Sequence, residues 1–303
     1  MCLWDAGRYV VDDGTVHPLT SYVLNYIKRL FDFLNALPTL FGEEADELAA
    51  RSSSAPLPSS GLLARATAIG KGFLQDPDVE GKSEAEKRMT VAVTRIFMVL
   101  QTNLETKASC YKRKALAQVF MMNNMHYIVK SVRKTPEMLT LLGEEWADRQ
   151  DDIVEQYCES YRLSSWADAM EYVSAVELDG TAMREKDRAM IKEKFRNFNT
   201  RLEELHHEQA QWAVPDPDLR VALRNSIIQL ILPSYGMFVE EFPASTFTKY
   251  PDKYIKYSPK RVEAMVQDLF ENKVKNWYQQ EAAYDSTRLS ILPRHHKMGF
   301  GGK

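Results

Sequence analysis

Apolar residues recur every three or four positions along most of this chain, and this spacing constrains the fold more than any other feature. Such spacing places the apolar side chains on one face of an α-helix. Ser83, with Glu86 three residues later, has the pattern of a capping box at the start of one such helix. Its apolar face would hold Met89, Val93, Ile96, Phe97, Leu100 and Leu104. Alternating segments joined by tight turns are scarce, so the sequence predicts an all-α fold of about nine or ten helices.

Two later runs repeat the helical pattern and are followed or interrupted by prolines. In the first, which starts near Lys186, Pro215 and Pro217 are expected to stop the helix. The apolar face of this helix would comprise Phe195, Phe198, Leu202, Leu205 and Trp212. In the second, Pro233 is expected to kink the helix or end it. The face of the second helix would comprise Leu219, Leu223, Ile227, Leu230 and Ile231.

Residues 115–129 are apolar on almost every side, which indicates a helix buried among other helices. Asn123, Asn124 and His126 interrupt this segment, and they would need polar partners inside the protein. Large side chains elsewhere are expected to fill space between helices rather than to form a binding face. These are Met121, Met122, Met125, Trp146, Trp166 and Trp212.

The chain of 303 residues, 45 % of them hydrophobic, is long enough for one large domain or two smaller ones. Residues 51–61 and 75–83 are rich in small, polar or turn-forming residues and predict loops. We expect a boundary between two helical layers near residues 178–180. The predicted organisation is therefore a helical bundle over 1–178, a C-terminal helical layer with a basic tip over 179–272, and a tail of unknown structure over 273–303.

Sequence patterns typical of enzymes are absent. His206 and His207 are adjacent, whereas the helical zinc motif needs two histidines four residues apart, so we expect no metal ligand here. The terminal Gly-rich stretch lacks the spacing of a phosphate loop, and no nucleophile elbow occurs. No apolar run reaches the ~18 residues that a membrane-spanning helix requires. The three cysteines favour a reducing compartment. We predict a protein without catalytic residues, metal or cofactor.

The formal net charge of −3 conceals a strong asymmetry between the two ends of the chain. From residue 249 to 303 there are 11 basic and 6 acidic residues, a balance of +5, which leaves −8 for residues 1–248. A basic terminal region on an acidic body favours an anionic partner at that end. The alternative is an ordinary solvated surface whose charges serve solubility.

The basic residues are concentrated in the segment 247–261, where tyrosines alternate with them: Lys249, Tyr250, Lys253, Tyr254, Lys256, Tyr257, Lys260 and Arg261. Ser258 followed by Pro259 is typical of a helix start, and free N–H groups at a helix N-terminus suit phosphate. A phospholipid surface would attract these cations. Single-stranded nucleic acid could use the same charges with stacked tyrosines. In a third interpretation the loop is merely solvated and its tyrosines pack inward.

Several segments of the sequence resemble the 70-kDa subunit family of the exocyst, the vesicle-tethering complex. Their residues look most like those of the plant branch of this family. The most distinctive are MNNMHYIV within 104–135 and KYIKYSP within 253–270. Further blocks in the same order are DGTVHPLTSYVLNYIKRL at 13–30, and the segments 141–170 and 195–227. Together they cover most of residues 5–272 and are similar to the C-terminal half of family members.

The resemblance implies an elongated rod of stacked antiparallel helix pairs joined by loops, whose C-terminal end binds phosphoinositide. In the family the lysines of the KYIKY motif make this contact, and here they are Lys253 and Lys256. Lys249, Lys260 and Arg261 join the predicted lipid site on charge alone.

The resemblance also implies other exocyst subunits as partners, an anionic plasma membrane, and a cytoplasmic protein held peripherally on it. Small GTPases or pathogen effectors are further possible partners, and nucleic acid is not expected. The function expected is non-enzymatic tethering of secretory vesicles. The alternative is a protein-interaction module of plant immunity that effectors or immune regulators bind, for which the sequence singles out no residues.

Overall fold

The computed structural model of the chain describes residues 10–32, 84–176 and 183–271. These ranges contain nine α-helices, one short 3₁₀ helix and no strand, apart from an isolated bridge between Ala213 and Glu271. The prediction of an all-α fold is confirmed. The helices are α1 (Pro18–Asp32), α6 (Glu84–Ala108), α7 (Lys114–Arg133), α8 (Pro136–Leu142), α9 (Glu144–Tyr172), α10 (Glu185–Gln209), α11 (Pro217–Glu241), α12 (Ala244–Phe247), the 3₁₀ helix η2 (Pro251–Lys253) and α13 (Pro259–Gln267).

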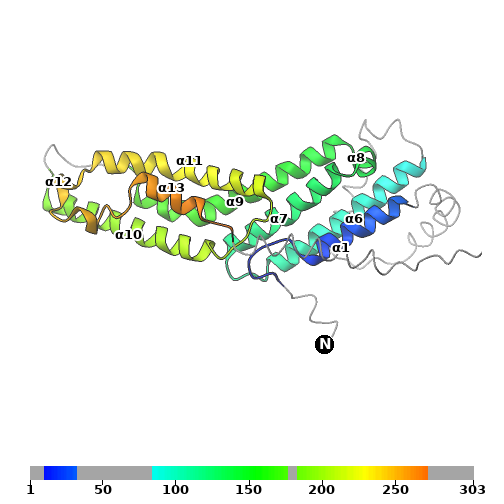
Figure 1. The fold of residues 1–303 in the computed structure, drawn as a ribbon, viewed down its shortest axis with the longest axis horizontal. Helices are drawn as coiled ribbons and strands as arrows, with labels where there is room; N and C mark the ends of the chain where they lie inside the picture. Colours follow the sequence, from blue (N-terminus) through cyan, green and yellow to red (C-terminus); the bar gives the residue numbers. More distant parts are fainter. Residues whose placement is uncertain (1–9, 33–83, 177–182, 272–303) are drawn as a thin grey trace, which may run out of the picture.

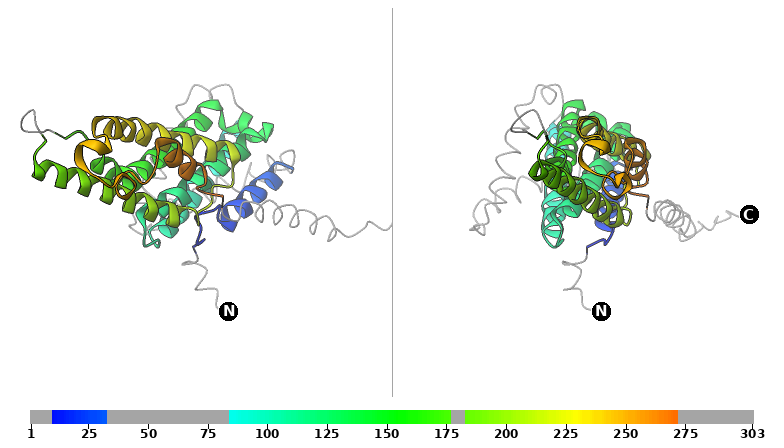
Figure 2. Two further views of the ribbon diagram at one scale, coloured as in Figure 1. Left: turned by 60° about the vertical axis from the view of Figure 1, so that its left-hand side comes forward. Right: turned by 90° about the vertical axis from the view of Figure 1, so that its left-hand side faces the viewer.

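The long helices lie side by side along one axis, so the molecule is a rod (Figure 1). One end holds α10, α11, α12 and α13, and the other holds α1, α6 and α8. Helix α9 joins the two ends, because it packs against α7 and α8 as well as α10 and α11. The end-on view in Figure 2 shows the helices bundled around this shared axis. The rod implied by the resemblance is therefore confirmed.

The predicted helical faces are the buried ones, although two helix ends differ from the prediction. Helix α10 buries Phe195 and Phe198 but ends at Gln209, so Trp212 is buried in the connection that follows and not on the helix. Pro233 does not end α11, which continues to Glu241. At the other end of the connection, Asp216 caps α11 by accepting hydrogen bonds from the backbone N–H groups of Asp218 and Leu219, both at 3.1 Å.

Helix α7 is buried on most sides, and its two asparagines find the internal partners that the sequence required. The Nδ2 of Asn123 donates to the carbonyl oxygens of Gly14 at 2.7 Å and Ala213 at 2.9 Å. The Oδ1 of Asn124 accepts from the backbone N–H of His17 at 2.9 Å and from the hydroxyl of Thr20 at 2.7 Å. These hydrogen bonds connect α7 to two other segments, namely the start of α1 with the residues before it and the connection that precedes α11.

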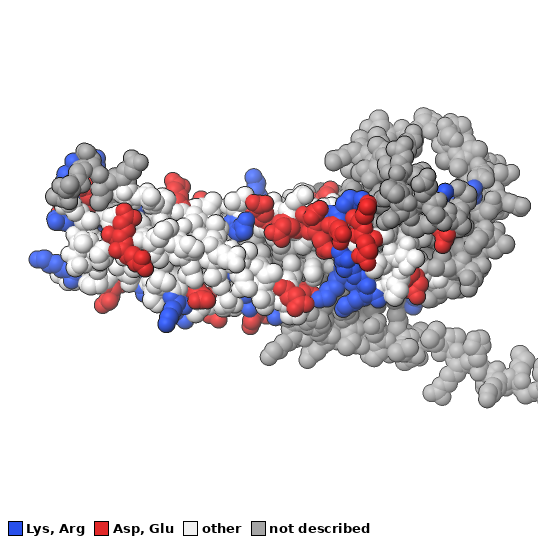
Figure 3. All heavy atoms as spheres, turned by 90° about the horizontal axis from the view of Figure 1, so that it is seen from above, with Lys and Arg blue, Asp and Glu red and all other residues white. Residues whose placement is uncertain are grey.

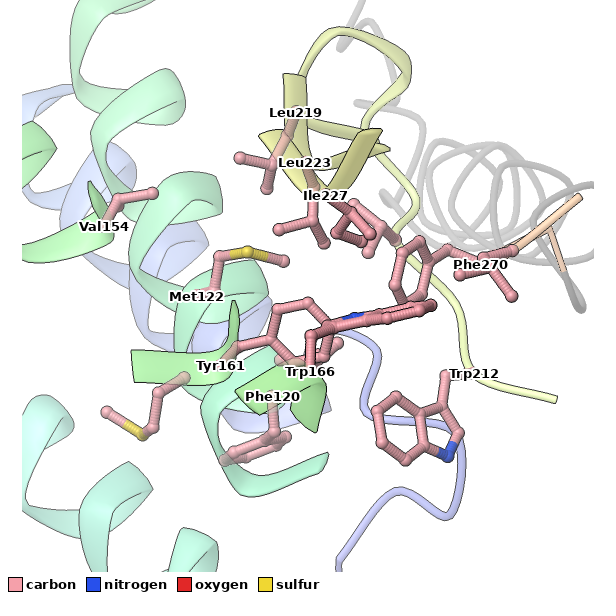
Figure 4. Close-up of a cluster of buried hydrophobic side chains, with 14 of the residues drawn as sticks. Phe120, Met122, Val154, Tyr161, Trp166, Trp212, Leu219, Leu223, Ile227 and Phe270 are labelled. Atoms are coloured by element: carbon pink, nitrogen blue, oxygen red, sulfur yellow. The ribbon is translucent and has the colours of Figure 1, made fainter. Parts of the chain in front are cut away.

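The middle of the rod is filled by large side chains from α7, α9 and α11 and from the segments that follow α10 and α13 (Figure 4). Tyr161 lies at its centre, where its hydroxyl donates to Gln209 Oε1 at 2.7 Å and accepts from Trp166 Nε1 at 3.1 Å. Its ring also meets Trp212 and Phe270 edge-on. The expected interior positions are all buried: Met121, Met122, Met125, Trp146, Trp166 and Trp212.

Several predictions lie outside the described residues, namely the Ser83 cap, the loops 51–61 and 75–83, and the tail 273–303. The boundary near 178–180 also lies outside them, so the division into residues 1–178 and 179–272 stays a prediction. Among the described helices, none is both long and apolar enough to cross a bilayer.

Candidate functional site

The five basic residues singled out in the sequence lie on the surface toward the α12 end of the rod. Lys249 follows α12, Lys253 ends η2, and Lys256 lies in the connection to α13. Lys260 and Arg261 occupy the first turn of α13. All five side chains are exposed. The segment that carries them is called the tip loop below, and it comprises residues 248–261.

The backbone of the tip loop is fixed by contacts with α10, α11 and α12. Tyr254 is buried with its ring edge-on to Phe247, the last residue of α12, at 6.0 Å between centroids. Its carbonyl oxygen accepts a hydrogen bond at 2.8 Å from Asn199 Nδ2 on α10. The carbonyl oxygen of Tyr257 accepts another, at 2.5 Å, from the hydroxyl of Tyr235 on α11. The lysines therefore project from a loop with a defined backbone.

The three tyrosines of the tip loop have different surroundings. Tyr254 is buried and Tyr257 is half-buried, whereas Tyr250 keeps 72 % of its surface exposed. The interpretation in which all three pack inward is therefore wrong for Tyr250. Stacking of successive bases on interleaved tyrosines would need several exposed rings, and only Tyr250 in this loop has one.

Lys253 shares an aromatic ring with a cation from another part of the chain. Its Nζ lies 5.8 Å from the centre of the Tyr254 ring, and the Cζ of Arg196 on α10 lies at the same distance. Both distances are within the range of a cation–π contact. Arg196 is exposed, and it adds a sixth positive charge to the surface of the tip loop.

Lys256, in contrast, already has an anionic partner. Its Nζ lies 2.6 Å from Oε1 of Glu203 on α10, and the hydroxyl of Tyr257 donates to the same oxygen at 2.9 Å. The hydrogen bond from Lys256 lowers the pKa of Glu203, and the hydrogen bond to Glu203 raises the pKa of Lys256. Both side chains are about half exposed, so the pair is accessible from solvent.

The predicted helix start at Ser258 is confirmed, with a consequence for phosphate binding. The Ser258 side chain accepts from the backbone N–H of Arg261 at 3.3 Å, and Pro259 occupies the first turn. The N–H groups of Arg261 and Val262 also donate to the Ser258 carbonyl oxygen. Because the helix occupies these donors itself, the positive charge here comes mainly from the side chains of Lys260 and Arg261.

Comparison with known proteins identifies the family of the chain. Residues 5–268 match the family model for the C-terminal region of Exo70, a component of the exocyst complex. The chain belongs to the Exo70 family of exocyst subunits. It is 36 % identical over 281 residues to the exocyst complex component EXO70A1 of Arabidopsis thaliana, covering 90 % of this chain and 38 % of that protein. It is 31 % identical over 267 residues to the human exocyst complex component 7, covering 86 % and 32 % respectively.

Solved structures confirm the Exo70 fold. Two structures of Saccharomyces cerevisiae Exo70 match with TM-scores of 0.57 and 0.55 at 20 % and 22 % identity. In both, the match covers 88 % of this chain and 49 % of the yeast chain. This Exo70-family chain thus spans about half the length of the yeast protein and less than half that of the curated relatives it matches.

Two residues of the Exo70 tip that the sequence did not single out are Arg196 and Glu203. Together with Asn199 they lie on one face of α10, at spacings of three and four residues, and all three meet the tip loop. Their spacing shows that they share a helical face. Nothing in the sequence indicates that this face meets a loop about fifty residues later.

Other charged groups, including the histidines noted in the sequence, lie in or near contacts within the fold. Lys130 pairs with Asp216, and His126 Nε2 lies 3.4 Å from the same carboxylate, beside a small hollow. Arg133 contacts the carboxylates of Glu144, Asp148 and Asp151 at 2.7–2.8 Å. His206 lies 4.0 Å from Asp268, and His207 is exposed. No group of three or more possible metal ligands occurs in the described ranges.

Proposed function

We propose that this chain is the membrane-binding part of an exocyst subunit, which helps tether secretory vesicles to the plasma membrane by binding anionic phosphoinositide. It works by binding rather than by catalysis, with other exocyst subunits as partners, and it is held peripherally on the cytoplasmic face of the membrane. Membership of the Exo70 family supports the exocyst assignment. The tip loop supports the choice of ligand.

The observation that carries the proposal is a group of exposed cations without carboxylate partners among the described residues. They are Lys249, Lys253, Lys260 and Arg261 of the tip loop and Arg196 of α10. An anionic lipid surface attracts each Lys or Arg near it by about 1 kcal/mol, and salt weakens the attraction. Four such charges on a loop with a fixed backbone, with a fifth beside it on α10, suit a flat surface of phosphate groups.

The test is vesicle binding by the full chain, measured across a salt series. Vesicles of phosphatidylcholine with a phosphoinositide are compared with phosphatidylcholine alone. Because two cations are removed, Lys249→Ala with Lys253→Ala should weaken binding to the phosphoinositide vesicles about thirty-fold. The loss should shrink as salt is added.

The matched control is Lys112→Ala with Lys114→Ala, which removes two exposed lysines, one from the connection between α6 and α7 and one from the start of α7 (Figure 1). This variant should bind the vesicles like the parent. The proposal fails if the parent does not prefer phosphoinositide vesicles, or if the tip-loop and control variants bind equally well.

A second candidate function, protein interaction, is supported by the outer surface of α11. Between Arg220 and Glu240 the helix has a single charged residue, Arg224, which is buried. Val221 and Met237 are exposed on this stretch, and space is open beside Gly236. Figure 3, which views the rod from above, shows a largely uncharged surface over the half of the rod that holds α11 and α12. Such a surface suits a helix of another exocyst subunit, a small GTPase, a pathogen effector or an immune regulator.

The two functions can be separated with one substitution on α11. Met237→Asp should weaken cross-linking to purified exocyst subunits while leaving vesicle binding unchanged. Thr200→Asp, on the exposed surface of α10, is the control for an added charge. Equal cross-linking of both variants and the parent would exclude this surface as the contact.

A further inference from the structure

The pair of Lys256 and Glu203 sets Lys256 apart from the other cations of the tip. Four tip-loop cations and Arg196 have no carboxylate partner in the described part of the chain, whereas Lys256 has one at 2.6 Å. At the distance of a lipid phosphate the two opposite charges largely cancel. A headgroup that recruits Lys256 must therefore compete with a carboxylate already in contact with it.

Glu203 is not needed to hold the tip loop in place. Asn199 and Tyr235 bind the loop through two backbone carbonyl groups, and the buried ring of Tyr254 packs against α12. These contacts involve no charge on Glu203. Loss of that charge should leave the loop where it is and release the ammonium group of Lys256.

The carboxylate of Glu203 also stays ionised under ordinary conditions. The hydrogen bond from Lys256 lowers its pKa, and the hydroxyl of Tyr257 supports the same charged form. The pair is consequently a constant feature of the free protein at neutral and mildly acidic pH, not one that a small change of pH removes.

We propose that Glu203 restrains the tip: it holds Lys256 in an ion pair that lowers affinity for phosphate-bearing headgroups, and binding transfers Lys256 from Glu203 to a phosphate. This inference rests on the proposed membrane function and adds a residue that limits it. A partner or modification that displaced the Glu203 side chain would strengthen membrane attachment without any change in the basic residues themselves.

The experiment compares vesicle binding of the full-length chain and four variants. Glu203→Gln removes the charge but keeps an oxygen to accept the hydrogen bond from Tyr257. Glu204→Gln is the matched control, because its carboxylate pairs with Arg201 at 3.5 Å instead of with the tip loop. Lys256→Ala is made alone and together with Glu203→Gln.

On phosphatidylcholine vesicles with phosphoinositide, Glu203→Gln should bind about three- to fivefold tighter than the parent, since one cation is released. Glu204→Gln should change binding by less than about twofold. The gain from Glu203→Gln should be smaller when Lys256 is alanine, because only the repulsion between Glu203 and the membrane is then relieved. Titration with water-soluble inositol trisphosphate shows whether free phosphate groups give the same gain or whether a lipid surface is required.

The inference is overturned if Glu203→Gln binds no tighter than Glu204→Gln, or if its gain is as large without Lys256 as with it. Weaker binding by Glu203→Gln would show that the carboxylate positions Lys256 for the membrane, which is the opposite role. If the parent ignores phosphoinositide vesicles, the proposed function fails as well. If the parent binds phosphoinositide vesicles but Glu203→Gln and Glu204→Gln bind them equally well, only this inference fails.

Discussion

Cations in the two halves of the rod have different surroundings. Around α7 and α9, Arg133 contacts three carboxylates and Lys130 pairs with Asp216. At the α12 end, Lys253 and Arg196 lie over the ring of Tyr254. Neither forms an ion pair with a carboxylate among the described residues. Identical residue types thus form ion pairs within the fold in the first case and carry a charge without a carboxylate partner in the second. A count of charges along the sequence cannot separate these two uses.

This difference predicts that fold stability and membrane binding respond to separate sets of substitutions. Removing the large side chain of Trp166 should have the largest effect. It is fully buried beside Tyr161, so Trp166→Ala should lower the free energy of unfolding by about 3–5 kcal/mol. Denaturant unfolding measures this loss. Vesicle binding of the molecules that remain folded should be unchanged, and a parallel loss of binding would contradict the separation.

Asp216 is the next test, because it caps α11 and pairs with Lys130. Asp216→Ala should destabilise the protein by about 1–2 kcal/mol, and Asp216→Asn should lose less because it can still cap. Burial opposes ionisation of this carboxylate, but hydrogen bonds from Lys130 and Leu219 and the charge of His126 outweigh it and lower its pKa.

The lowered pKa of Asp216 also gives the sign of a pH effect. Its stabilising contribution is present above the unfolded pKa of about 4 and is lost as the pH falls toward the lower folded pKa. Unfolding of the parent and of Asp216→Ala at several pH values should therefore converge in acid. A difference that stayed constant down to acid pH would show that the charge of Asp216 contributes nothing.

Within the tip, unpaired and paired lysines should differ. Lys253→Ala should weaken binding to phosphoinositide vesicles about fivefold, since it removes a charge without a carboxylate partner. Lys256→Ala together with Glu203→Gln should weaken it less, because the two charges that are removed already cancel each other. Both proteins should melt like the parent. Equal losses in the two variants would mean that the ion pair opens freely before binding.

The smallest effect is expected for the cation that comes from α10. Arg196→Ala should weaken vesicle binding about two- to threefold, because its charge adds to the surface but lies outside the tip loop. Arg188→Ala provides a comparison, since Arg188 on the same helix pairs with Glu185 at 3.4 Å. An effect of Arg196→Ala no larger than that of Arg188→Ala would remove Arg196 from the site.

The sequence predicted the fold well because helical periodicity is a local signal. The face with Val93, Phe97 and Leu100 is buried as expected, and Ser258 caps its helix. Helix ends were less accurate. The helix containing Phe195 stops before Trp212, and the one containing Pro233 passes through it, because tertiary packing overrides the local preference.

The candidate site was predicted only in part, for a physical reason. The lysines of the tip loop are adjacent in sequence, so their charge is visible there. The ion pair of Lys256 with Glu203 and the shared ring of Lys253 and Arg196 join residues more than fifty positions apart. Contacts of this kind follow from how α10 packs against the loop, and no spacing within either segment encodes them.

The proposed function requires that the α12 end of the rod, and not its middle or its other end, meets the membrane. Hydrogen exchange of the full chain with and without phosphoinositide vesicles tests this most directly. We predict slower exchange in the tip loop, residues 248–261, and unchanged exchange in α6, α7 and α9. Protection of α1 and α6 with none in the tip loop would contradict the account.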